Sequence, residues 1–413
     1  MYLSKTDRTK QYLCSFVLAT GCVIWFANTT LGIYKMFPTI ILILLCSKYL
    51  ITTKCKQARY VTVLAVVTII SATITQPSSQ SFNYMFLWSL LENVIFLIIG
   101  YNFAKNNLIT NKFIFCIIFI IGAISSLTIT NFLFGFPNWT SPIESIRLET
   151  LFIEHNITNI EAVKLYSTGF GIGRTGWAAT LSLFIPLCLL CIENKYKTKL
   201  SKLLLCIIFT SIFISGSRGG LVSVATMLLL YVVFVYKKNQ KSVSTLFIAS
   251  TIILMLCILY SSFLIEYLRL DSGDLTTGRS DQYDLIPEMI ETMGFWGLGE
   301  NGTFTFMSKH GIDHELHNSY INNLLKYGWI VGISIIAGSF YLIRLVFRSL
   351  KKGRNIYLKV FPLIIISGFV SALFEPRAIY GARSWYVVWW FFLGAILFYT
   401  NNKGNSSSKI IEQ

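Results

Sequence analysis

The chain is divided by long runs of apolar residues, each close to the length that a helix needs to cross a bilayer. A hydrocarbon core is spanned by about 20 apolar residues. Backbone inside lipid must satisfy its own hydrogen bonds, which favours helices. Twelve runs meet this length: 11–27, 34–50, 60–75, 83–104, 112–134, 177–192, 199–216, 219–236, 244–264, 329–346, 356–374 and 384–400. We therefore predict an all-α polytopic membrane protein of about 12 transmembrane helices, with residues 1–413 forming one integral membrane domain.

The basic residues predict which side of the membrane each loop occupies. Charged residues make up only 13% of the chain, yet its net charge is +16. Sorted by alternating loops, 24 Lys and Arg lie on the side of both termini and 11 on the other. The positive-inside rule then places both termini in the cytoplasm, and this distribution argues against a nucleic-acid partner. The first run lacks a small-residue cleavage site, so we expect it to remain in the membrane as a span.

Two predicted loops are much longer than the rest, and both fall on the outer side. They cover residues 135–176 and 266–327 and contain every histidine of the chain: His155, His310, His314 and His317. Long loops in compact proteins tend to carry function. We expect each loop to contain some helix, and we expect any chemistry to take place on this face.

Arginine dominates the few basic residues of the outer side. Seven of the 11 are Arg, and several stand beside glycine near the ends of spans: Arg174, Arg218, Arg279 and Arg383. A guanidinium group presents a fork of donors that fits phosphate oxygens, and glycine lets backbone approach a ligand. The pattern predicts a phosphate or diphosphate site near the outer interface. The other interpretation is that these side chains extend to lipid headgroups.

Three segments carry the most specific pattern. They are Ser-Gly-Ser-Arg-Gly-Gly at 215–220, Thr-Gly-Arg-Ser-Asp-Gln-Tyr at 277–283, and Leu-His-Asn-Ser-Tyr at 316–320. This ordered set, with a Gly-Arg segment at 173–174, resembles the O-antigen ligase and O-antigen polymerase superfamily of bacterial inner-membrane glycan transferases. The longer polymerase motif, with glycine eleven residues after an arginine, is absent, because Ile290 and Leu229 occupy those positions.

The resemblance implies a GT-C-like membrane glycosyltransferase whose active site faces the periplasm. Its donor would be a glycan carried on undecaprenyl diphosphate, and the lipid diphosphate would be the leaving group. The resemblance implies no metal and no other cofactor. It also implies membrane lipid, a flippase and a chain-length regulator as partners.

The resemblance transfers roles to named residues. Arg218 and Arg279 would hold the diphosphate and stabilise the charge that grows as the glycosyl bond breaks. His317 would orient or deprotonate the acceptor hydroxyl, for which an imidazole pKa near neutrality is suited. Substrate contacts are expected from Arg174, Arg377, Asn318, Tyr320 and Tyr283.

Several alternatives stay open. A polymerase joins lipid-linked repeat units, whereas a ligase transfers the finished glycan to the lipid A–core. The segments at Arg174 and Asn318 favour a polymerase. A flippase for the same lipid is less favoured, because such a protein places its charges along a central cavity.

Two local features also admit other interpretations. The stretch from His310 to His317 approaches a helical zinc pattern. Within the spans, Glu92 is the main acidic residue, and Glu375 at a span end is placed to orient a nearby arginine.

Overall fold

The computed structural model describes residues 4–24, 36–52, 56–75, 84–134, 174–235, 279–299, 301–312, 316–353, 355–375, 380 and 387–401. Every regular element in these ranges is a helix, and an isolated β-bridge joins Gly294 to Gly297. The all-helical fold is thus confirmed for the described part of the chain. The predicted loop 135–176 lies outside it up to residue 173.

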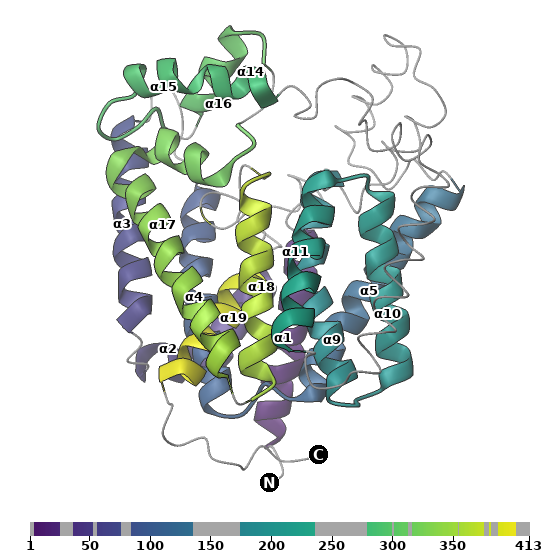
Figure 1. Cartoon of the computed structure of the whole chain (residues 1–413). Helices are drawn as coiled ribbons and strands as arrows, with labels where there is room; N and C mark the ends of the chain where they lie inside the picture. Colours follow the sequence, from purple (N-terminus) through teal and green to yellow (C-terminus); the bar gives the residue numbers. More distant parts are fainter. Residues whose placement is uncertain are drawn as a thin grey trace.

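The predicted apolar runs form a bundle of helices (Figure 1). In chain order the helices of the bundle are α1 (Lys5–Ile24), α2 (Met36–Thr52), α3 (Lys56–Thr75), α4 (Tyr84–Lys105), α5 (Asn111–Phe134), α8 (Arg174–Ser182), α9 (Ile185–Glu193), α10 (Thr198–Ile214), α11 (Arg218–Phe234), α17 (Ser319–Lys352), α18 (Tyr357–Ala372) and α19 (Val387–Asn401). The run 244–264 lies outside the described residues, and each of the other predicted runs contains a helix.

Five helical segments of the described part are long and apolar enough to cross a membrane. They are Gln57–Thr75, Leu87–Lys105, Asn111–Thr130, Thr175–Glu193 and Ser319–Lys351. Shorter apolar helices include α11, α18 and α19. The membrane character of the chain is supported, while the number of twelve crossings and their direction stay predictions.

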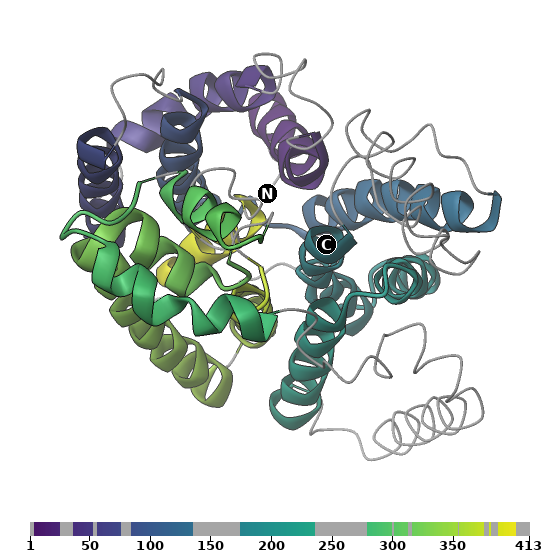
Figure 2. The same cartoon turned by 90° about the horizontal axis from the view of Figure 1, so that it is seen from above.

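Three short helices cover one end of the bundle (Figure 1). They are α14 (Arg279–Asp284), α15 (Ile286–Thr292) and α16 (Gly302–Lys309), and they show that the predicted loop 266–327 does contain helix. We call this the covered end. The start of α1 and the end of α19 lie at the opposite end. Seen from above, the three short helices overlie the half of the bundle that contains α3 and α17, and α8–α11 form the other half (Figure 2).

Helix α19 packs against α4 so closely that their backbones touch. A Cβ atom added at Gly394 would lie 2.0 Å from the carbonyl oxygen of Leu97, and one added at Gly100 would lie 1.8 Å from that of Phe391. Small residues at helix interfaces allow such approach in membrane proteins. The pair forms the centre of the apolar core, in which Trp389, Phe391 and Phe96 are buried.

Helix α18 lies between α11 and α17 and is buried along almost its whole length. The Ser371 hydroxyl hydrogen-bonds the Ser223 hydroxyl of α11 at 2.9 Å. On the other side, the Tyr320 hydroxyl of α17 donates to the Phe369 carbonyl at 3.4 Å. The end of α18 therefore lies beside the starts of both α11 and α17, at the covered end.

Helix α17 is broken at Gly328, whose backbone has φ 77° and ψ −173°. The break takes the Leu325 and Lys326 carbonyls out of the helical pattern, and the N–H groups of Leu298 and Gly299 donate to them at 2.7 and 3.0 Å. Segment 295–299 thus supplies hydrogen bonds that the helix has lost. Within an apolar bundle such replacement is needed, because unsatisfied backbone is costly there.

A second break differs from the prediction of one continuous run at 177–192. The chain forms α8, turns at Leu183 and Phe184, and continues as α9. The N–H groups of these turn residues donate to the carbonyls of Thr180 and Leu181 at 3.2 and 3.0 Å. Pro186 follows directly in the first turn of α9, where its missing N–H is tolerated.

Candidate active site

His317 and Asn318 lie at the start of α17, at the covered end of the bundle. The Asn318 side chain is the cap of the helix, since its Oδ1 accepts the N–H groups of Tyr320 and Ile321 at 3.0 and 3.2 Å. This capping fixes the backbone directly after His317. His317 is half-buried. Asn318, for which we predicted a substrate contact, therefore uses its side-chain oxygen to cap α17.

Gln282 of α14 holds His317 from the other side. The N–H of His317 donates to Gln282 Oε1 at 3.1 Å, and the Gln282 side chain is fully buried. Arg279 begins the same short helix, and residues three apart share a helix face. The structure therefore brings the helix of Arg279 to His317. Sequence analysis gave Gln282 no role, and its position three residues after an arginine was the only local signal.

Arg218 begins α11 at the covered end and is half-buried. The preceding residue, Ser217, caps the helix by accepting the N–H of Gly220 at 3.2 Å. A Cβ added at Gly219 would lie 2.8 Å from Phe374 Cβ, so this helix start touches the end of α18. Arg218 and His317 thus flank the end of α18 from two helices.

A buried acidic residue, Glu375, follows the end of α18, and only 4% of it is exposed. Its N–H donates to the Ser371 carbonyl at 3.0 Å. The prediction that Glu375 orients an arginine stays a prediction, because Arg377 and Arg383 lie outside the described residues.

A buried polar face on the first segment of α17 was not predicted. Its members are Ser319, Asn322, Asn323 and Lys326, each exposed by 3% or less. Asn323 Nδ2 donates to the carbonyls of Ser319 and Tyr380 at 2.6 and 3.3 Å. Sequence analysis counted Lys326 only as an outer-loop cation. The spacing of three and four residues between these polar side chains could have identified a helical face.

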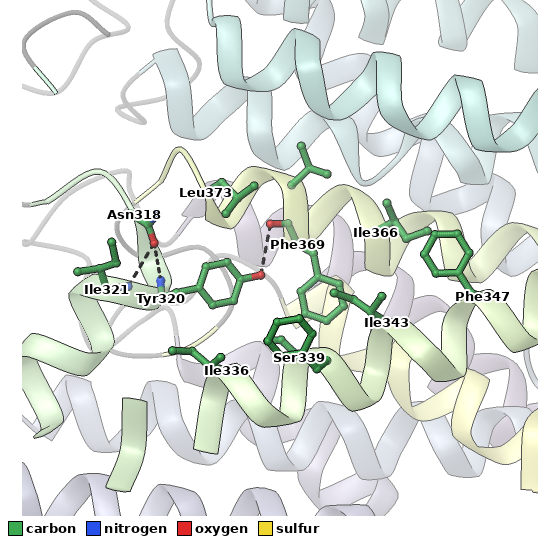
Figure 3. Close-up of a pocket in the computed structure, with 12 residues that line it drawn as sticks. Asn318, Tyr320, Ile321, Ile336, Ser339, Ile343, Phe347, Ile366, Phe369 and Leu373 are labelled. Atoms are coloured by element: carbon green, nitrogen blue, oxygen red, sulfur yellow. Dashed lines mark hydrogen bonds between the residues drawn. The ribbon is translucent and has the colours of Figure 1, made fainter. Parts of the chain in front are cut away.

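An apolar groove of about 490 Å³ lies between α17 and α18 (Figure 3). Asn318 and Tyr320 line one end of it, next to His317, and Phe347 lines the other end. The Phe347 ring contacts Phe234 of α11, with 6.3 Å between ring centroids. Phe340, also in the lining, is 70% exposed, so the groove is open along the side of the bundle.

The covered end holds charges of both signs. Helices α11 and α17 both begin there, and a helix start carries about half a positive charge. Arg218 adds a full positive charge, while the end of α18 and the buried Glu375 after it are the negative contributions. The arrangement is therefore suited to a ligand that combines a polar part at the covered end with an apolar part in the groove.

For the other predicted site residues, the structure shows fewer contacts with His317 and Arg218. Tyr283 lies on α14 and is 37% exposed, while Tyr320 faces the groove and contacts Phe369. Arg174 and Arg279 are the first residues of α8 and α14. The structure describes the backbone at these two positions but not the side chains. Arg377 lies outside the described residues.

The metal alternative gains no support from the described residues. His310 faces α15, with Nε2 3.6 Å from a carboxylate oxygen of Glu288. Its Nδ1 lies 3.0 Å from the Phe306 carbonyl oxygen. Residues 313–315 lie outside the described part, and within that part no group of three metal-ligating side chains occurs.

Residues 203–336 match the sequence profile of a family described as O-Antigen ligase. The match starts in α10 and ends within α17, so it includes Arg218, Arg279 and His317 and leaves Arg174 and Arg377 outside. No curated protein matches the chain. The family match confirms the resemblance that the three sequence segments predicted.

Proposed function

Because residues 203–336 relate this chain to the O-antigen ligase and polymerase superfamily, we propose that it is an O-antigen polymerase. Its substrates are oligosaccharide repeat units carried on undecaprenyl diphosphate. It transfers the growing glycan to the next lipid-linked unit at the periplasmic face of the inner membrane. A flippase that delivers the units and a chain-length regulator are its expected partners.

The observation that carries this proposal is the polar site at the end of an apolar groove. His317, Asn318 and Arg218 lie at the covered end, and the groove between α17 and α18 leads away from it. A lipid-linked glycan has the same division, with a charged diphosphate between a hydrocarbon chain and a sugar. A soluble sugar donor would leave the apolar part of the site unused.

In the proposed reaction, one glycosidic bond forms, one glycosyl–phosphate bond breaks and one proton is transferred. A hydroxyl oxygen of the acceptor sugar forms a bond to the anomeric carbon of the donor, and the bond from that carbon to the diphosphate oxygen breaks. The bonding electrons leave with the diphosphate, whose growing charge is stabilised by Arg218 and Arg279. The acceptor proton passes to the imidazole of His317.

No metal ion or other cofactor is required in this scheme, because guanidinium groups and helix starts supply the positive charge. Arg174 and Arg377 are proposed to contact the glycan or the phosphates. The aromatic rings of Tyr283 and Tyr320 are proposed to contact sugar, although the Tyr320 hydroxyl is also held by α18.

Ligase activity is the second candidate, and it is favoured by the description of the matched family as O-Antigen ligase. Both reactions use the same donor and leaving group. They differ in the acceptor, which is another lipid-linked unit for a polymerase and lipid A–core for a ligase. The described residues that face the site serve either acceptor.

The surface-glycan ladder of a deletion strain separates the candidates. A strain that keeps one repeat unit on its lipid core identifies a polymerase. Bare core together with long glycan on the carrier lipid identifies a ligase. Repeat units that accumulate on the cytoplasmic side of the membrane would identify a flippase and overturn both proposals.

Complementation with variants then tests the arginines. Arg218→Lys and Arg279→Lys should restore little of the ladder, since a point charge does not replace the guanidinium fork. Arg348→Lys is the matched control, because Arg348 lies on α17 near the opposite end of the bundle and is exposed. Full ladders from Arg218→Lys or Arg279→Lys would contradict the diphosphate role.

A further inference from the structure

The carboxamide of Gln282 has no part in the proposed reaction, yet its environment is unusual. The side chain is 0% exposed. Its Oε1 accepts the N–H of His317 at 3.1 Å. Its Nε2 is also buried and has no hydrogen-bond partner among the described residues. The amide orientation follows from the first contact, because a backbone N–H can pair only with the amide oxygen.

An unpaired buried donor destabilises a folded protein by about 1–3 kcal/mol. A glutamate would keep the acceptor for the His317 N–H without this unpaired amide donor, and an apolar residue would lose both groups. A glutamine here is therefore best explained by a use for both ends of its amide.

We propose that Gln282 is a positioning residue for His317, and that its Nε2 donates to an oxygen of the acceptor sugar. This inference rests on the proposed function. Oε1 fixes the backbone of His317 on one side, while Asn318 fixes it on the other by capping α17. Nε2 is the donor that remains beside the histidine, where the acceptor hydroxyl must be placed.

The short helix α14 carries both Gln282 and the proposed diphosphate-binding Arg279. Arg279 begins the helix and lies three residues before Gln282, on the same face. A displacement of α14 would therefore move the proposed diphosphate arginine together with the anchor of the histidine. Gln282 couples the two halves of the proposed reaction within a single helical turn.

Two variants distinguish the role of Oε1 from that of Nε2. The assay follows turnover by the purified full-length chain in proteoliposomes, with the lipid-linked repeat unit extracted from the deletion strain as the probe. Gln282→Met removes both hydrogen-bonding groups and should lower kcat roughly tenfold or more, because catalysis is sensitive to small misplacement. Gln282→Glu keeps the acceptor for the His317 N–H and loses the donor. It should retain most of kcat and raise KM several-fold.

Gln11→Met is the matched control. Gln11 is also a buried glutamine, and its Nε2 donates to the Leu108 carbonyl at 2.7 Å at the end of the bundle opposite the site. Its loss should lower stability without changing kcat or KM. A merely structural role for Gln282 would make Gln282→Met behave like Gln11→Met.

The outcomes are distinguishable. Wild-type kcat in Gln282→Met, with an inactive His317→Ala, overturns the inference and leaves the proposed function intact. Gln282→Glu as slow as Gln282→Met, with both proteins folded, overturns the anchoring through Oε1. Full turnover in His317→Ala overturns the proposed function itself. If Gln282→Met does not fold, recovery of kcat in Gln282→Glu relative to Gln282→Asn, whose shorter side chain cannot reach, decides the same question.

Discussion

The contact between α4 and α19 and the contact between α17 and segment 295–299 both depend on glycine, but they are held together differently. At the first, Gly100 and Gly394 let two regular helices approach until backbone meets backbone. At the second, Gly328 breaks a helix, and the loop donates hydrogen bonds to the carbonyls that the break releases. The Ser71 hydroxyl of α3 adds bonds to the Trp296 and Tyr327 carbonyls at 2.7 and 3.1 Å.

The two contacts illustrate two ways to fix position in an apolar environment. Close packing of α4 on α19 depends on shape, and it fixes the centre of the bundle. Hydrogen bonds are directional, so the second contact also fixes the orientation of the first segment of α17. That segment carries His317 and Asn318 at its start. We expect substitutions at the first contact to prevent folding of the whole bundle. Substitutions at the second contact should destabilise mainly segment 295–299 and the first segment of α17.

The largest effect is expected for Gly394→Leu. Its Cβ would lie 2.0 Å from the Leu97 carbonyl oxygen, and the two backbones cannot both remain in place. We expect destabilisation of about 3 kcal/mol or more and little folded protein in the membrane fraction. Gly338→Leu is the control, because a Cβ at Gly338 meets nothing within 4 Å. Equal amounts of the two variants on size-exclusion chromatography would refute the packing argument.

Gly328→Ala should have the next largest effect. The new Cβ would lie 2.1 Å from the Phe295 carbonyl oxygen, and φ of +77° is unfavourable for any L side chain. Gly311→Ala separates these causes, since Gly311 also has φ +77° but an open surrounding. A positive φ alone should cost a residue with a Cβ atom about 1–3 kcal/mol. Thermal unfolding in detergent should show a clearly greater loss for Gly328→Ala, and equal losses would mean that the contact is unimportant.

Ser71→Ala should act mainly on the loop contact. It removes the hydroxyl that donates to two carbonyls, with an expected cost of about 1–3 kcal/mol. Hydrogen exchange should become faster at residues 295–299 and 319–327, while α4 and α19 keep their protection. Thr73→Ala is the control, because the exposed Thr73 hydroxyl bonds only its own helix. Uniform acceleration across the bundle would show that the two contacts do not behave independently.

The smallest change in stability is expected for Asn318→Ala. Loss of this cap should destabilise by about 1 kcal/mol. Asn318→Asp keeps a capping oxygen and should restore the melting temperature. Turnover should return with it, because the cap holds the backbone directly after His317. A variant that regains stability but not turnover would give the Asn318 amide a role beyond capping.

The helices themselves could be predicted from the sequence, because apolar runs of the right length have few other structures available. The breaks were missed. Pro186, which follows the turn between α8 and α9, is a sequence signal that could have predicted the first break. Gly328 adopts a conformation that appears only with its hydrogen-bonded partner segment, so the second break had no such signal. The predicted loop 266–327 included segment 319–327, which contains the polar residues Asn322, Asn323 and Lys326. In the structure these side chains face the interior of the protein.

The candidate site was predicted in part for a similar reason. Motif resemblance identified Arg218 and His317, which the structure places at the same end of the bundle. Their neighbours depend on tertiary contacts. The Gln282 amide and the His317 N–H belong to segments separated by α15 and α16, and no local pattern in the sequence reports that pairing.

The groove opens along the side of the bundle, as the 70% exposure of Phe340 and the 45% exposure of Leu373 indicate. A molecule with a hydrocarbon tail would therefore enter by diffusing in two dimensions, without passing through water. Its encounter rate would depend on the mole fraction of that lipid in the bilayer and not on a volume concentration. Diluting reconstituted vesicles with buffer should leave turnover per protein unchanged, whereas diluting the substrate with inert lipid should lower it.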